Sequence, residues 1–145
     1  MGTVAWTSVS PMLSMFTTPE CTEHDRRLTE QLAADPVLTT LRPGLTRTGD
    51  HHAAPCQRDS DDSGIASTMI GADPSLPQDA VVAYYRGLLE DGGWTIATGD
   101  LAVLLCADRR FDGQQVRFTL HGSSGSPQYA LEIVFRPDRH DLACT

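Results

Sequence analysis

Lysine and asparagine are both missing from this chain, whereas arginine occurs 11 times. The codons of lysine and asparagine are AT-rich, and those of arginine are GC-rich. The composition therefore indicates a very GC-rich genome, such as that of an actinobacterium. Because asparagine is missing, the chain also has no acceptor for N-linked glycosylation.

Charged residues are missing from the start of the chain, where Met1 to Pro19 carries none. A signal peptide begins with a basic region, and a membrane-spanning helix needs about 20 mostly apolar residues. Serine, threonine and proline interrupt the apolar residues here, so the segment matches neither pattern as it stands. We expect residues 1–18 to be a flexible arm or the remnant of a signal or anchor segment, with a membrane anchor then lying upstream. Residues 19–145 are expected to form a single α+β domain.

The chain has few basic residues relative to acidic ones, with a net charge of −8 and a pI of about 4.9. This balance argues against nucleic-acid binding and against adhesion to anionic lipid. At 145 residues, the chain is long enough to bury a hydrophobic core without depending on cross-links.

The cysteines are never closely spaced, and none forms a C-x-x-C pair. Four widely spaced cysteines are typical of two disulfides, which form in oxidising compartments outside the cytoplasm. Two hairpins of the predicted sheet would allow Cys106 to pair with Cys144, leaving Cys21 with Cys56. The rival pairing joins Cys56 to Cys106 and Cys21 to Cys144, and the residues alone leave the choice open. Four free thiols would instead favour a cytoplasmic protein with metal or redox chemistry.

Metal-binding patterns in the chain are weak. Asp59, Asp61 and Ser63 match the first half of a calcium-binding EF-hand loop, whose oxygen ligands alternate along the chain. The twelfth position of that loop should be acidic but is Ile70, so we expect a solvated acidic turn. The His51–His52 pair would point apart in a strand, and the H-E-x-x-H pattern is missing. No metal site beyond the weak calcium candidate, no cofactor and no catalytic residue is predicted.

Two helices and a long loop are expected before the last strands. Capping and proline signals predict a helix over Thr18–Ala34, with Cys21 on its buried stripe and a helical turn at Pro36–Leu41. Proline and glycine delimit a second helix over Pro77–Gly93, whose wide apolar face predicts packing against a sheet. The segment Pro43–Ser63 is expected to be a loop.

Strands are predicted where apolar residues alternate or form short runs. In the best example, Val116, Phe118 and Leu120 point inward and the residues between them point outward. The fold class expected is α+β, an antiparallel β-meander of four to five strands with two helices packed on one face. The predicted strands are Ile65–Ile70, Trp94–Thr98, Leu101–Ala107, Gln114–His121 and Tyr129–Arg136.

The segment Ala80–Trp94 has the form V-x-x-Y-Y-R-x-x-L closed by Gly-Gly-Trp. With Pro43-Gly44 ahead of a loop that contains Cys56, it resembles small exported or lipid-anchored actinobacterial α+β proteins. The likeness covers the chain from about Leu41 to Arg136. Its motifs are structural, so it implies a compartment and a fold type and brings no activity. It also implies the rival disulfide pairing, in which Cys56 joins Cys106.

Arginines are expected to gather at one end of the sheet, where they would suit an anion or a carboxylate. Aspartates lie between them in the sequence, which favours an ordinary mixed-charge surface. The arginines concerned are Arg109, Arg110, Arg117, Arg136 and Arg139.

The leading hypothesis is an exported or envelope-associated, non-catalytic binding module with a protein or small-molecule partner outside the cytoplasm. One alternative is a secreted inhibitor of an extracellular enzyme that presents the loop His121–Gln128. Another is a small hydrolase that uses histidine with aspartate or serine, although the chain has no G-x-S-x-G motif. The predicted binding surface comprises Arg117, Thr119, His121, Glu132 and Arg136.

Overall fold

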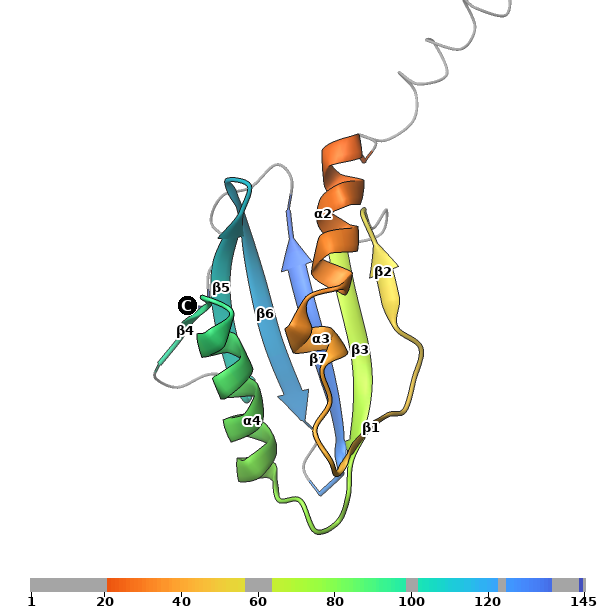
Figure 1. Ribbon diagram of the computed structural model, residues 1–145, viewed down its shortest axis with the longest axis vertical. Helices are drawn as coiled ribbons and strands as arrows, with labels where there is room; N and C mark the ends of the chain where they lie inside the picture. Colours follow the sequence, from red (N-terminus) through yellow and green to blue (C-terminus); the bar gives the residue numbers. More distant parts are fainter. Residues whose placement is uncertain (1–20, 57–63, 99–101, 123–124, 137–143, 145) are drawn as a thin grey trace, which may run out of the picture.

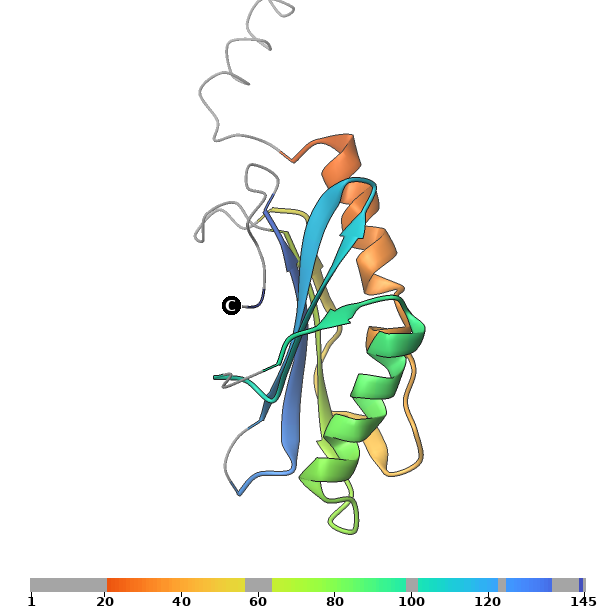
Figure 2. The same cartoon turned by 90° about the vertical axis from the view of Figure 1, so that its left-hand side faces the viewer.

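A seven-stranded antiparallel sheet carries helices on one face (Figures 1 and 2). This computed structural model describes residues 21–56, 64–98, 102–122, 125–136 and 144. The α+β class and the meander are confirmed, with more strands than the four to five expected. The elements are α2 (Glu23–Ala33), α3 (Pro36–Thr39), β1 (Leu45–Arg47), β2 (His52–Ala54), β3 (Gly64–Ala72), α4 (Gln78–Asp91), β4 (Thr95–Ile96), β5 (Leu105–Phe111), β6 (Gln114–Gly122) and β7 (Gln128–Phe135).

The sheet joins a meander to strands from earlier in the chain. Strands β4, β5, β6 and β7 pair in chain order, and β7 then pairs with β3. Strands β1 and β2 both pair with β3 and together form the far edge of the sheet. After β3, the chain crosses the sheet through α4 to reach β4 at the opposite edge (Figure 1).

Helix α2 begins later than predicted because a capping box fixes its start. The Thr22 hydroxyl accepts a hydrogen bond from the Asp25 amide, and the Asp25 carboxylate accepts one from the Thr22 amide, both at 3.1 Å. These bonds satisfy amides that have no partner inside the helix. The predicted start at Thr18 is therefore wrong, and Cys21 precedes the helix instead of lying on its buried stripe. The predicted turn at Pro36–Leu41 is present as α3.

Helix α4 matches its prediction closely. It spans Gln78–Asp91, with Pro77 as its N-cap residue and Gly92 as its C-cap residue. Val81, Tyr85 and Leu89 follow one another at intervals of four residues and are fully buried. This spacing places one stripe of the helix against the sheet.

Strand β5 is shifted by four residues from its predicted position. The prediction was Leu101–Ala107, but the strand runs from Leu105 to Phe111 and ends at the Asp112-Gly113 turn. Both turn residues have positive φ, at 51° and 81°, which suits a two-residue hairpin. That turn sets the register, and Arg109 is accommodated because its guanidinium stacks over the Phe111 ring, 4.4 Å from the centroid.

The predicted loop Pro43–Ser63 is wrong in part because it contains β1 and β2. Each strand has three residues, and most of their side chains are exposed, so neither shows an alternating pattern. Both pair with β3 and so satisfy backbone groups along its outer edge. Strands β3, β6 and β7 lie within two residues of their predicted bounds.

Candidate functional site

The side of the sheet that faces away from the helices is the first candidate site, and we name it the open face. In Figure 2, α2 and α4 lie on one side of the sheet, and the C-terminal end of the chain lies on the other. Side chains of each strand alternate between the two sides, and the register aligns them across the strands. From β3, β5, β6 and β7, the open face receives Ile65, Ser67, Met69, Cys106, Asp108, Arg117, Thr119, His121, Ala130, Glu132 and Val134.

The structure brings the predicted surface residues together on the open face. Thr119 on β6 lies directly opposite Glu132 on β7, and Arg117 lies opposite Val134. Alternation along β7 puts Arg136 on the same side, directly after the strand. Charged, hydroxyl and imidazole groups are therefore neighbours on two adjacent strands.

A hydrogen bond links two of these side chains. The Nε2 atom of His121 lies 2.9 Å from the hydroxyl oxygen of Thr119, whose residue is 7% exposed. Histidine beside a hydroxyl is the first half of a nucleophilic dyad. Among the described residues, no carboxylate bonds to the other nitrogen of His121, so the group that would orient such a base is missing there.

The predicted arginine cluster is divided between the two faces. Arg110 and Arg117 lie on the open face, and Asp108 is directly opposite Arg117. Arg109 lies on the other face, where it stacks on Phe111. Arg139 lies outside the described residues. The Nε atom of Arg117 is buried and has no hydrogen-bond partner.

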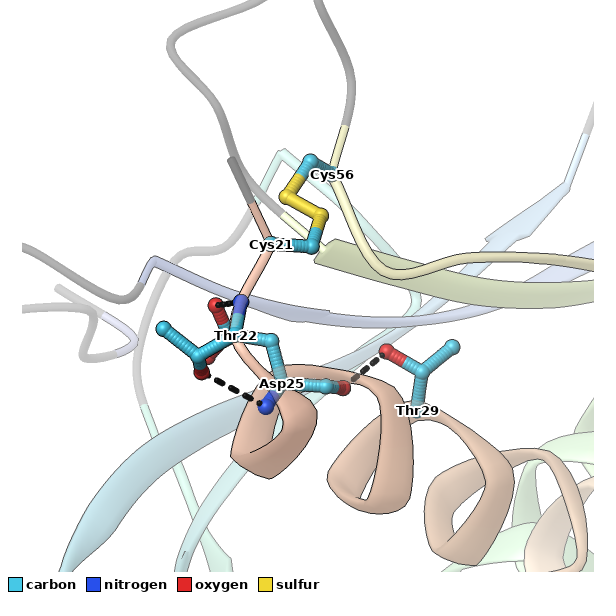
Figure 3. The surroundings of a disulfide bond; sticks show 5 residues. All are labelled: Cys21, Thr22, Asp25, Thr29 and Cys56. Atoms are coloured by element: carbon cyan, nitrogen blue, oxygen red, sulfur yellow. Dashed lines mark hydrogen bonds between the residues drawn. A yellow bond between two sulfur atoms is a disulfide. The ribbon is translucent and has the colours of Figure 1, made fainter. Parts of the chain in front are cut away.

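One disulfide joins the start of α2 to the end of β2. Cys21 and Cys56 have Cα atoms 5.8 Å apart, which is typical of disulfides. Figure 3 shows the bond beside the capping box of Thr22 and Asp25. The bond therefore holds one end of the helix against the edge of the sheet.

The second disulfide lies on the open face. Cys106 on β5 is directly opposite Thr119 and is bonded to Cys144, with Cα atoms 5.8 Å apart. The pairing of Cys56 with Cys106, implied by the resemblance, is wrong. Cys56 follows β2, and four strand spacings separate β2 from β5, or about 19 Å. A disulfide needs Cα atoms within about 7 Å.

A groove between α2 and β2 is the second candidate site, and sequence reasoning missed it. Its volume is about 540 Å³, within the usual range of ligand pockets. Most of its lining is apolar, and three of its residues are alanines. No sequence pattern indicated it, because β2 was not predicted as a strand. The groove is lined by Arg26, Thr29, Glu30, Ala33, Ala34, His51, Ala53 and Pro55.

The metal candidates gain no support. His51 and His52 are exposed, and the described residues contain no group of three metal-ligating side chains. The weak calcium candidate, Asp59, Asp61 and Ser63, lies outside the described residues. No helix in the described ranges is long and apolar enough to cross a membrane.

Comparison with known proteins identifies no family. No protein-family model, no curated protein and no solved structure matches the chain. The resemblance to exported actinobacterial proteins therefore stays a prediction, and any function must be argued from the geometry.

Two core hydroxyls are buried without hydrogen bonds. Tyr85 on α4 is fully buried, and its hydroxyl has no hydrogen-bond partner. The hydroxyl of Thr68 on β3 is also buried and also has no hydrogen-bond partner. Burial raises the pKa of Tyr85 well above its ordinary value, and neighbouring Tyr84 adds to the shift, while Arg47 opposes it. Both groups lie in the core rather than in either candidate site.

Proposed function

We propose that this protein is an exported binding module that contacts its partner through the open face. The observation that carries the proposal is that Arg117, Thr119, His121 and Glu132 project from adjacent strands onto a face that no described helix covers. Apolar neighbours accompany them, including Met69, which is 40% exposed. Arginine beside apolar groups is typical of the residues that dominate protein interfaces.

The disulfides support the proposed compartment. Two bonds join all four cysteines of the chain, and such bonds persist in oxidising environments outside the cytoplasm. One of them, Cys106–Cys144, lies within the open face and rigidifies it. A rigid surface loses little conformational entropy when it binds.

Binding suits the chemistry of the open face better than catalysis does. Its groups are charges, hydrogen-bond donors and hydrogen-bond acceptors that lie on adjacent strands. The Thr119 hydroxyl is already bonded to His121. We therefore infer that the partner is a protein or a small molecule that is recognised by shape and charge.

The partner can be sought by cross-linking from the face itself. A photoreactive amino acid placed at Met69 should capture the partner from the cell-envelope fraction of a producing actinobacterium. The same group placed at Ala83, on the exposed stripe of α4, is the matched control. We expect a captured species with Met69 that is missing with Ala83.

Affinity for the purified partner then tests the surface. The double variant Arg117→Ala/Glu132→Ala should weaken binding at least about tenfold. The control is Asp79→Ala/Arg86→Ala, which removes one charge of each sign from the exposed stripe of α4. Equal affinities for the two double variants would refute the open face as the binding surface.

A further inference from the structure

We propose a second docking site, independent of the open face, at which an extended peptide adds to the outer edge of β2. In the described part of the chain, β2 pairs with β3 alone. Half of the backbone groups of an edge strand point away from its neighbour. Among the described residues, no backbone hydrogen bond other than those to β3 involves His52–Ala54. These groups are therefore free to pair with another strand.

The groove lies where the side chains of an added strand would project. Ala53 faces the helix side of the sheet, as does its partner Ala66 in the core. Across from Ala53, α2 contributes Ala33 and Ala34 to the same groove. Every second side chain of an added strand would point toward α2. Small methyl groups on both walls leave space for those side chains.

Spacing and charge along α2 specify the sequence of the peptide. Arg26, Glu30 and Ala34 line the groove at intervals of four residues, or about 6 Å along the helix. Alternate side chains of a strand repeat at about 6.6–6.8 Å, and α2 runs alongside the strands (Figure 1). The complementary peptide therefore carries an acidic, a basic and an apolar residue at positions i, i+2 and i+4.

The direction of the peptide follows from the disulfide Cys21–Cys56. That bond joins the start of α2 to the end of β2, so the two elements run in opposite directions. Every strand pair in this sheet is antiparallel, and an antiparallel addition to β2 runs in the same direction as α2. The acidic residue therefore comes first, which gives the order Glu-x-Arg-x-Leu.

Arg26 is available for this contact. Its ion pair with Glu23 is 4.0 Å long, and both side chains are more than half exposed. Such surface pairs contribute little free energy. Pro55 directly after β2 limits how far a partner strand extends, which favours a short peptide over a long sheet-to-sheet contact.

The test uses the full chain, labelled with ¹⁵N, and the peptide acetyl-Thr-Glu-Thr-Arg-Thr-Leu-Thr-amide as the probe. Titration should shift the amide signals of β2 and of the groove side of α2, and should slow hydrogen exchange in β2. A peptide with Glu and Arg exchanged is the charge control, and a peptide methylated on alternate backbone nitrogens is the hydrogen-bond control. We expect both to bind at least about tenfold more weakly.

Protein variants complete the test. Arg26→Glu/Glu30→Arg exchanges two exposed charges, and it should reverse the preference between the two charged peptides. Ala34→Trp should abolish binding by filling the groove, whereas Gln31→Trp, exposed on the same helix outside the groove, should leave it unchanged. No shift at millimolar peptide, or equal binding of both charged peptides, would overturn the proposal. A dimer in sedimentation that Ala34→Trp dissociates would also overturn it, because a second copy would then occupy the site.

Discussion

Replacing Tyr85 by phenylalanine should stabilise this fold. The Tyr85 side chain is fully buried, and its hydroxyl makes no hydrogen bond. Such a group loses its bonds to water on folding and regains none, at a cost of about 1–3 kcal/mol. Phenylalanine keeps the ring, including its edge contact with Tyr84 at 5.0 Å between centroids. We expect a gain of about 1–2 kcal/mol, or roughly 3–6 °C in the melting temperature.

The same substitution should change how stability depends on pH. Burial raises the pKa of Tyr85 in the folded state, whereas in the unfolded state the pKa stays near its ordinary value of about 10. The folded state then holds the proton more tightly, so stability is complete below about pH 10 and falls above it by up to about 1.4 kcal/mol per pH unit. Tyr85→Phe should lose less stability over that range, because it removes this group.

Urea unfolding with the disulfides intact measures both effects, at about pH 7 and at about pH 11. Tyr84→Phe is the control, because Tyr84 is only half-buried, and its change at neutral pH should stay within about 0.5 kcal/mol. A loss of about 1 kcal/mol or more in Tyr85→Phe at neutral pH would refute the reasoning, because it would mean that the hydroxyl has a hydrogen-bond partner.

Two further predictions concern the backbone and the disulfides. Gly87→Ala in α4 should raise stability by about 0.5–1 kcal/mol, because an added Cβ meets no atom within 4 Å. Gly113→Ala should lower stability by about 1–2 kcal/mol, because Gly113 has a φ of +81°, which alanine adopts only with strain. Thermal unfolding compares them, and shifts of the same sign would contradict the assigned backbone. Peptide mapping of unreduced protein should join Cys106 to Cys144, and the variant Cys106→Ala/Cys144→Ala should lose up to about 4 kcal/mol. A peptide that links Cys106 to Cys56 would refute that pairing.

Strands with one buried face were predictable, and edge strands were not. Strands β6 and β7 alternate between apolar and polar residues because only one side of each meets the core, and their predicted bounds differ from the observed bounds by at most one residue at each end. Strands β1 and β2 are exposed on most positions and carry no such pattern. Strand β5 was misplaced because the apolar run before Leu105 imitates a buried strand, whereas the turn at Asp112-Gly113 sets the true register.

The two candidate sites also differ in how far the sequence predicts them. The open-face residues follow from period-two alternation, so the sequence could place Arg117, Thr119 and His121 on one side. The groove depends on how α2 packs against β2, and that contact is set by tertiary packing and by the bond between Cys21 and Cys56. The two predicted hairpins allowed the observed disulfide pairing, Cys106 with Cys144 and Cys21 with Cys56, whereas the pairing implied by the resemblance was wrong.

The pairing of β3 with β7 also constrains when the protein can fold. The longest ladder of β3 is completed by β7, so a nascent chain that ends before Gln128 leaves β3 and β6 each unpaired along one edge. Pairing of strands so distant in sequence is intrinsically slow. The sheet of the growing chain therefore stays incomplete until almost all of the chain has been synthesised. In the export that we propose, the sheet would be completed only after β7 has crossed the membrane.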